Sequence, residues 1–301
     1  MARIIWPGLN PVAGRPDNSL GSHRRCHLHI DRINVVPEVA MGLDKAAALK
    51  RYDKVLRENV TINDPSIEVV RSGNLTLMLG SDPAPNANMA TYIGQAADWR
   101  GPITQAISFF DSRNHGFEWK WFSHDGGEAQ SQVLTELGFE PQEAETMLMM
   151  AVAAPARTVA ETPGITYCSA SGPKHFQDIA RQHEKVYGKD YAWYGDSLER
   201  EWRTGPDKIL FYLAYDKDTL VSAAWVRYEQ DIGSFWGGAT LEDYRGRGIY
   251  RNLVALRYNA ALERGLVYLL VEASAMSRPI LERLGFETVG ITQPYFYTSK
   301  T

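Results

Sequence analysis

A loop of alternating arginines and glycines carries the clearest chemical signal in the sequence. Residues 243–254 have the sequence DYRGRGIYRNLV, with two arginines and two glycines between Arg245 and Gly248. Glycine allows φ > 0 and close approach of the backbone, and arginine adds charge-assisted hydrogen bonds. Apolar residues recur at helical spacing after Gly248, so a helix follows the loop. Because a first helical turn has unpaired N–H groups that favour an anion, a phosphate or pyrophosphate is the predicted ligand.

Two other kinds of phosphate-binding loop do not fit these residues. A P-loop requires G-x-x-x-x-G-K-[ST], and a dinucleotide-binding loop requires G-x-G-x-x-G, whereas Arg251 stands three residues after Gly248. A tight turn between a strand and a helix, with two solvated arginines, remains an alternative on these residues alone.

The loop resembles the acyl-CoA loop of the GCN5-related N-acetyltransferases, whose pattern is [QR]-x-x-G-x-[GA]. Residues 245–249 match that pattern, but Tyr250 stands where the family has Gly or Ala. We therefore expect Tyr250 to crowd the pyrophosphate position. The resemblance implies that acetyl-CoA is a cosubstrate held by residues from the end of a strand to the first helical turn. These are Thr240, Leu241, Arg245, Gly246, Arg247, Gly248, Ile249 and Tyr250.

The elements that position this loop follow the order of the same family. The predicted strands are 164–170, 209–215, 220–228, 234–241 and 266–271, and a closing hairpin is predicted over 286–297. Pro173 begins a helix that carries His183 on its apolar face, where a core or pocket-lining histidine is favoured over a catalyst. The predicted fold class is α/β, with a mixed central sheet flanked by helices.

An internal similarity predicts a second, degenerate copy of the fold. Val133–Glu140 (VLTELGFE) matches Ile280–Glu287 (ILERLGFE), although a helix end shared by chance is an alternative. Strands are predicted at 67–71, 74–80, 89–94 and 117–122, but the loop 94–103 lacks R-x-x-G-x-G and carries Asp98. The predicted organisation is a disordered tail at 1–37, a degenerate domain at 38–150, a linker at 151–163 and a catalytic domain at 164–301.

Acyl transfer to an amine requires a polarised thioester and a neutral amine. The resemblance implies that a backbone N–H near Thr240 donates to the thioester oxygen. Family members commonly have a Tyr that acts as general acid at the position of Leu281, and an Asn at that of Ser274. The usual proton donor is therefore absent from this position. We predict Glu272 as base and Tyr295 as acid; a solvated strand-end charge and a packed aromatic residue are the respective alternatives.

Composition excludes several classes of function. The chain has 301 residues, a net charge of −4 and a pI near 6.0, which does not favour nucleic-acid binding. Two cysteines indicate a reducing compartment, and neither a membrane-spanning run nor a signal peptide is predicted, so a cytoplasmic location is expected. Cys26, His27 and His29 have the wrong spacing for zinc, and no metal is predicted. Met41, just before a predicted helix at 43–56, is an alternative start to Met1.

The predicted function is N-acetyltransfer from acetyl-CoA to a primary amine by direct attack. The acceptor is expected to be a small molecule or peptide, and the chain a monomer or homodimer without nucleic-acid or membrane partners. A non-catalytic acyl-CoA-binding module, with Tyr250 and Leu281 as marks of lost chemistry, is the alternative function.

Overall fold

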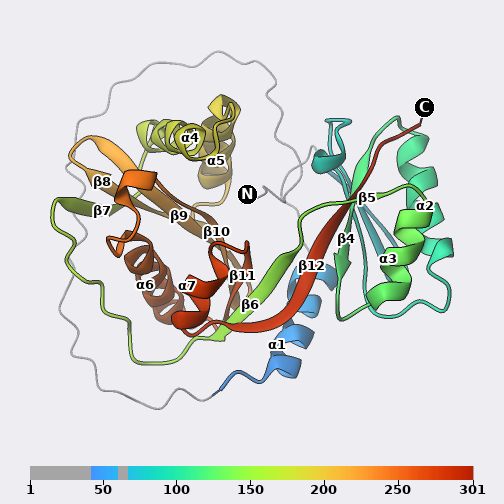
Figure 1. Ribbon diagram of the computed structural model, residues 1–301, viewed down its shortest axis with the longest axis horizontal. Helices are drawn as coiled ribbons and strands as arrows, with labels where there is room; N and C mark the ends of the chain where they lie inside the picture. Colours follow the sequence, from blue (N-terminus) through green and yellow to red (C-terminus); the bar gives the residue numbers. More distant parts are fainter. Residues whose placement is uncertain (1–41, 60–66, 301) are drawn as a thin grey trace. The chain divides into compact units, whose positions relative to one another are not determined.

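A computed structural model describes residues 42–59 and 67–300, which form two compact units (Figure 1). The first unit consists of residues 44–149 together with 272–300, and the second unit of residues 150–271. The predicted disordered tail, Cys26, His27 and His29, and Met41 lie outside the described residues.

The second unit is a mixed sheet covered by helices. Its strand order is β11-β10-β9-β8-β7; β10 and β11 are parallel, and the other neighbours are antiparallel. Figure 1 shows α4 and α5 on one side of this sheet and α6 on the other. Its elements are β7 (Ile165–Ser169), α4 (Pro173–Tyr187), α5 (Ala192–Thr204), β8 (Ile209–Asp216), β9 (Thr219–Glu229), β10 (Ile232–Thr240), a 3₁₀ turn η3 (Glu242–Tyr244), α6 (Ile249–Glu263) and most of β11 (Tyr268–Ala273).

The predicted strands and the helix after Pro173 of this unit are confirmed, but α5 was not predicted. Helix α4 buries Phe176, Ile179 and His183 at helical spacing and ends at Gly188, which has φ 66°. The core between the sheet and α6 is formed by Tyr167, Tyr212, Ala214, Val221, Ala224, Ile249, Leu253, Leu256 and Ala260.

The first unit also contains a mixed sheet, in the order β1-β2-β3-β4-β12-β6. Strands β3 and β4 are parallel. Its elements are α1 (Lys45–Tyr52), a π-helical turn η1 (Asp53–Glu58), β1 (Glu68–Ser72), β2 (Leu75–Leu79), a 3₁₀ turn η2 (Pro85–Ala87), β3 (Met89–Tyr92), α2 (Arg100–Asp111), β4 (Phe117–Phe122), α3 (Gly127–Glu136), β5 (Glu140–Pro141), β6 (Glu145–Ala151), α7 (Arg278–Arg283) and β12 (Glu287–Tyr297).

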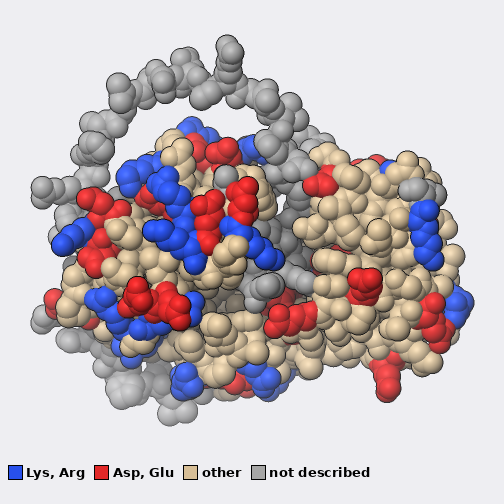
Figure 2. Space-filling view, turned by 45° about the horizontal axis from the view of Figure 1, so that its top comes forward, with Lys and Arg blue, Asp and Glu red and all other residues tan. Residues whose placement is uncertain are grey.

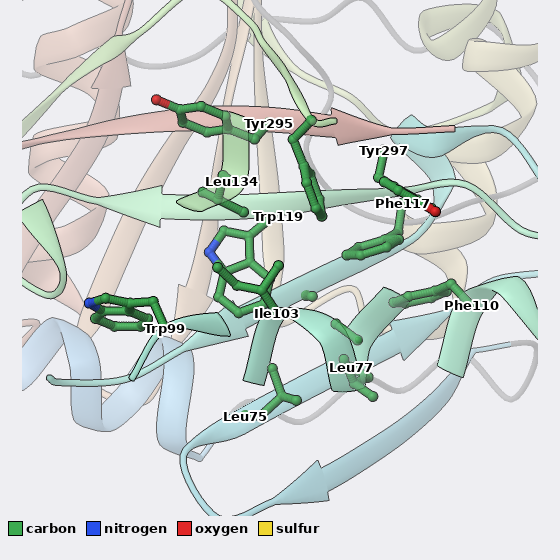
Figure 3. Packing of buried hydrophobic residues seen from close by; sticks show 13 residues of the cluster. Leu75, Leu77, Trp99, Ile103, Phe110, Phe117, Trp119, Leu134, Tyr295 and Tyr297 are labelled. Atoms are coloured by element: carbon green, nitrogen blue, oxygen red, sulfur yellow. The ribbon is translucent and has the colours of Figure 1, made fainter. Parts of the chain in front are cut away.

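One face of this sheet packs against α2 and α3. Trp119 from β4 and Tyr295 and Tyr297 from β12 meet Ile103 and Phe110 of α2 there (Figure 3). The rings of Phe110 and Phe117 are stacked, with centroids 4.3 Å apart. No helix in the described part of the chain is long and apolar enough to cross a bilayer.

The C-terminal segment forms one continuous strand, so the predicted hairpin at 286–297 is wrong. β12 pairs antiparallel with β4 on one edge and with β6 on the other. Residues 272–300 therefore group with the first unit, whereas the predicted catalytic domain runs from 164 to 301. That assignment concerns which residues act together in function, and it remains a prediction.

The two L-G-F sequences adopt the same helix-terminal structure. Gly138 and Gly285 have φ values of 89° and 90°. The Phe139 N–H donates to the Leu134 carbonyl, and the Phe286 N–H donates to the Leu281 carbonyl. This local agreement suits any helix that ends on a glycine. The degenerate second copy therefore remains a prediction.

Candidate functional site

Strand β10 has an open edge beside the predicted loop. It pairs with β11 only from Ile232 to Ser234 among the described residues, whereas its pairing with β9 continues to Thr240. Residues 235–240 consequently present backbone donors and acceptors along the edge that faces away from β9. An extended polar ligand can hydrogen-bond to such an edge.

A bulge lies in the middle of this open stretch. The register between β9 and β10 shifts between Trp236 and Ala239, and Gly237 has φ 61°. A methyl group added at Gly237 would lie 2.0 Å from the Trp225 ring, and one added at Gly238 would lie 2.7 Å from Cε2 of Tyr250. Glycine is therefore required at Gly237, and a side chain at Gly238 would displace the Tyr250 ring. The Gly-Gly pair inside a predicted strand was the sequence signal for this bulge, which we did not predict.

The last residue of β10 presents its backbone to the open edge. The N–H of Leu241 donates to the Val221 carbonyl at 2.9 Å, and successive N–H groups of a strand point to opposite edges. The Thr240 N–H therefore points away from β9. The Thr240 hydroxyl lies 2.7 Å from the Ser222 hydroxyl, which donates to the Ala239 carbonyl.

The predicted loop connects β10 to α6 through the short turn η3. Gly246 and Gly248 have φ values of 75° and 81°, where a side chain is strained. No atom outside the adjoining residues would lie within 4 Å of a methyl group on Gly246. Helix α6 starts at Ile249 without a side-chain cap, so its first N–H groups remain available for an anion.

Three exposed arginines belong to this loop and to the first turn of α6. Nε of Arg245 donates to the Thr240 carbonyl at 3.2 Å, and Nη2 of Arg247 donates to the Pro163 carbonyl at 3.1 Å. The Arg251 guanidinium would lie 3.5 Å from a methyl group on Gly248. Arg251 was missed, although its position one helical turn after the loop arginines was readable from the sequence. Together they supply positive charge at a helix N-terminus without an acidic cap.

Tyr250 points toward β10, and its predicted crowding of the pyrophosphate position remains a prediction. Its ring contacts Gly238 and would meet no added methyl group on Gly246 or Gly248. Residues Thr240 to Tyr250 therefore lie together in the second unit, with Tyr250 at the bulge and the arginines at the loop.

The two predicted catalytic residues belong to the first unit. Glu272 accepts a hydrogen bond from Nζ of Lys120 at 2.6 Å, and the lysine is buried. Burial lowers the pKa of Lys120, but Glu272, Glu118 and Glu145 outweigh that effect, and the pKa is raised overall. The lysine is thus charged, and Glu272 is an ion-paired carboxylate. This ion pair differs from the solvated strand-end charge that was the alternative, and the role of Glu272 as a base remains a prediction.

Tyr295 lies on the opposite face of the first unit's sheet. It is paired with Trp119 and is only 5% exposed in the core against α2 and α3, whereas Lys120 points to the other face. Burial raises the pKa of Tyr295. Its hydroxyl donates to Gln293 at 3.3 Å and points away from the core in Figure 3. The structure does not bring Glu272 and Tyr295 together.

The remaining residues considered for chemistry have structural surroundings. Burial lowers the pKa of His183 to about 4, and its ring lies among Tyr187, Tyr194 and Trp225. A neutral histidine on an aromatic wall agrees with the predicted core or pocket-lining role. Leu281 is fully buried.

One cluster in the first unit has the composition of a metal site. Asp53, His124 and Asp125 each offer a ligand atom. The Arg57 guanidinium lies among them, 2.6 Å from Asp53 and 2.5 Å from Asp125. Since this arginine already neutralises the carboxylates, the cluster does not favour a metal ion.

Charged side chains of both signs occur on one face of the molecule. On the face shown in Figure 2, basic and acidic side chains are interspersed on the part drawn in colour. An extended field of one sign, as nucleic-acid binding requires, is not present on that face.

Known proteins resemble this chain in part of its sequence and in its fold. Residues 174–286 match the model of the acetyltransferase (GNAT) family. A GCN5-related N-acetyltransferase from Kribbella flavida has a TM-score of 0.63 and 16% identity, covering 85% of this chain and 96% of that chain. No curated protein matches the sequence.

Two further solved structures share the fold. A GCN5-related N-acetyltransferase from Sphaerobacter thermophilus has a TM-score of 0.56 and 12% identity, with 85% of this chain and 86% of that chain covered. A tandem GNAT protein of the clavulanic acid biosynthesis pathway has a TM-score of 0.57 and 14% identity, with coverages of 80% and 86%. The mixed α/β fold, with a central sheet flanked by helices, is thus shared with this group.

Proposed function

We propose that the second unit binds acetyl-CoA and that the chain transfers the acetyl group to a primary amine by direct attack. The observation that carries this proposal is the open edge of β10, which runs from the Gly237 bulge to an uncapped, arginine-lined helix N-terminus. An edge of backbone amides suits the amide-containing arm of CoA, and the helix N-terminus suits its pyrophosphate. The family match over residues 174–286 supports the same assignment.

Each part of the site would supply a distinct interaction. The N–H groups at Gly246 to Arg251, with Arg245, Arg247 and Arg251, would bind the pyrophosphate. The Thr240 N–H and the neighbouring edge of β10 would hold the thioester and donate to its oxygen as negative charge develops. Direct attack then depends mainly on orientation, because no covalent enzyme intermediate is formed.

Proton transfer requires a base for the attacking amine. The attacking amine must be neutral, and an alkylamine in water has a pKa of about 10. Glu272 remains our proposed base, and its carboxylate is ion-paired with the Lys120 ammonium. Tyr295 remains only a sequence prediction, since its burial on the other face of the sheet argues against contact with the same substrate.

A non-catalytic acyl-CoA-binding module is a second candidate. The ion pair that occupies Glu272 and the buried Leu281 at the family's tyrosine position both favour it. The proposed acceptor is a small molecule or peptide amine, and the chain is proposed to act as a cytoplasmic monomer or homodimer. The proposed compartment is based on the two cysteines, of which Cys168 is buried.

Thioester consumption separates these candidates. Wild-type protein, with acetyl-CoA and a panel of polyamines, amino acids, aminoglycosides and peptide N-termini, is expected to release CoA thiol with at least one amine. Glu272→Gln is expected to lower kcat by more than about tenfold, because a glutamine cannot accept the amine proton. Glu287→Gln, at an exposed ion pair with Lys45, is the matched control. CoA binding without turnover by any amine would select the binding module, and an unchanged kcat and pH profile would exclude Glu272.

A further inference from the structure

A buried arginine lies behind the open edge of β10 without a carboxylate partner. Arg257 of α6 is 1% exposed. Its Nε donates to the Leu253 carbonyl at 3.0 Å, and Nη1 donates to the Trp225 carbonyl at 3.4 Å. Its guanidinium also stacks over Phe235, 3.9 Å from the ring centroid. Among the described residues no acidic side chain pairs with it, although a buried cation normally has an anionic partner.

Tyrosine hydroxyls take the place of that partner. Burial lowers the pKa of Arg257, and the phenols of Tyr250, Tyr212 and Tyr228 act in the opposite direction, with Tyr250 the strongest of them. Nη2 of Arg257 has no hydrogen bond of normal geometry among the described residues, and the Tyr250 ring centroid is 5.9 Å from the guanidinium carbon. The positive charge of Arg257 therefore lies near the Tyr250 phenol at the bulge.

The Tyr250 phenol is also placed where a thioester bound along β10 would lie. Tyr250 belongs to the first turn of α6, and its oxygen would be 3.3 Å from a methyl group on Gly238. Gly238 lies on the stretch of β10 that no longer pairs with β11. A hydroxyl held at this point can donate a hydrogen bond into the space beside the open edge.

We propose that Tyr250 donates the proton to the departing CoA thiolate and that Arg257 is a positioning residue that stabilises the resulting phenolate. This inference rests on the proposed function. The amine nitrogen forms a bond to the acetyl carbon, the C–S bond breaks, and its electron pair goes to sulfur. Sulfur takes the Tyr250 proton, while the proton lost by the attacking amine passes to a base or to water. Water then returns a proton to the phenolate.

This assignment supplies the donor that Leu281 does not. Leu281 is apolar and fully buried, so it has no proton to give. Tyr250 stands where the resembled loop has Gly or Ala, and its side chain serves the reaction centre while the loop glycines remain accessible.

The test follows the thiol of bound CoA and requires no knowledge of the acceptor. Full-length wild type, Tyr250→Phe and Tyr228→Phe are each titrated with CoA and with acetyl-CoA by calorimetry at neutral pH. Tyr228 is the matched control, since its phenol also supports Arg257 but lies opposite Gly233, away from the bulge. The thiolate absorbance of bound CoA is then measured against pH; a free thiol has a pKa of about 8.5.

A phenol that donates to sulfur stabilises the thiolate over the thiol. We expect Tyr250→Phe to raise the pKa of the bound thiol by about one unit, a tenfold loss of thiolate preference. Acetyl-CoA affinity is expected to stay within about twofold of wild type, as for loss of a contact made mainly to the thiolate. Tyr228→Phe should titrate like wild type.

The arginine has its own readout. Arg257→Gln is expected to shift the thiol pKa in the same direction as Tyr250→Phe, and Arg257→Lys, which keeps the charge, is expected to restore part of the shift. A Tyr250→Phe titration that coincides with wild type would overturn the inference while leaving CoA binding in place. Wild type that binds no CoA would overturn the proposed function, and this inference with it.

Discussion

The two units contain the same local arrangement, a strand, a loop, a helix and a parallel strand, but the charged groups at the two helix N-termini differ. In the second unit the arrangement is β10, α6 and β11, and in the first it is β3, α2 and β4. At the start of α2, Asp98 accepts a hydrogen bond from the Arg100 N–H at 3.0 Å, and Trp99 is buried in the core. The N-terminus of α2 thus carries its own carboxylate, whereas that of α6 is surrounded by arginines.

The strand edges differ in the same way. β3 and β4 pair over only two residues on each strand, so the first unit also has a stretch where parallel strands separate. The Arg57 guanidinium fills it: Nη2 donates to the Tyr92 carbonyl at 2.6 Å and to Asp125 at 2.5 Å. The Arg57 side chain from η1 therefore occupies the Tyr92 carbonyl, a backbone acceptor on this stretch. We infer that a ligand site requires an accessible strand edge in addition to the fold.

The largest effect on CoA binding is expected from a substitution in the loop before α6. Gly248→Glu should weaken CoA binding by about a hundredfold or more, because it places an anion beside the pyrophosphate. Gly94→Glu is the control, since Gly94 has φ 80° and a methyl group there would meet no atom within 4 Å outside the adjoining residues. Calorimetry on both folded variants measures their CoA affinities. Equal affinities would contradict the proposed difference between the two loops.

Removing the Arg57 guanidinium should lower the stability of the first unit. Arg57→Ala leaves Asp125 buried without its cation, and a loss of about 3–5 kcal/mol in the free energy of unfolding is expected. Lys50→Ala, at an exposed position of α1, is the control and should change little. CoA affinity should be unchanged where the protein remains folded. Urea unfolding followed by fluorescence measures the effect, and a loss near that of the control would contradict the role of Arg57.

The same cluster predicts a pH dependence. Burial raises the pKa of Asp53, but its hydrogen bond to His124 and the charge of Arg57 outweigh burial, and the pKa is lowered overall. A lowered pKa means that this stabilisation is present above the ordinary Asp range and is lost as the pH falls through the folded-state value. Asp53→Asn should reduce the acid dependence of unfolding between about pH 5 and pH 3. If Asp53→Asn loses stability at acid pH as wild type does, the proposed contribution of Asp53 is wrong.

A smaller effect is expected from a single loop arginine. Arg251→Ala should weaken CoA binding by about 1–3 kcal/mol, as the loss of one charge-assisted contact does. The loss should shrink as salt is added, because the side chain is exposed. Arg100→Ala, at the start of α2, is the corresponding change in the first unit and should leave CoA affinity as it was.

Local features of the site could be predicted, whereas the distant contacts could not. The glycines, the arginines and the helix after them lie within a few residues of one another, so their types define the loop. Two contacts join residues that are far apart in the sequence. Arg57 hydrogen-bonds to Asp125, and Glu272 is ion-paired with Lys120. β12 was mistaken for a hairpin because its partners β4 and β6 precede it by more than a hundred residues. Sequence periodicity carries no information on such pairings.

The stoichiometry of CoA binding tests the difference between the two units most directly. Full-length protein titrated with CoA by calorimetry is predicted to bind one molecule per chain, and Gly248→Glu should abolish that site while Gly94→Glu preserves it. Two equivalent sites per chain, or a single site that survives Gly248→Glu and is lost in Gly94→Glu, would contradict the assignment of the open edge of β10 as the ligand site.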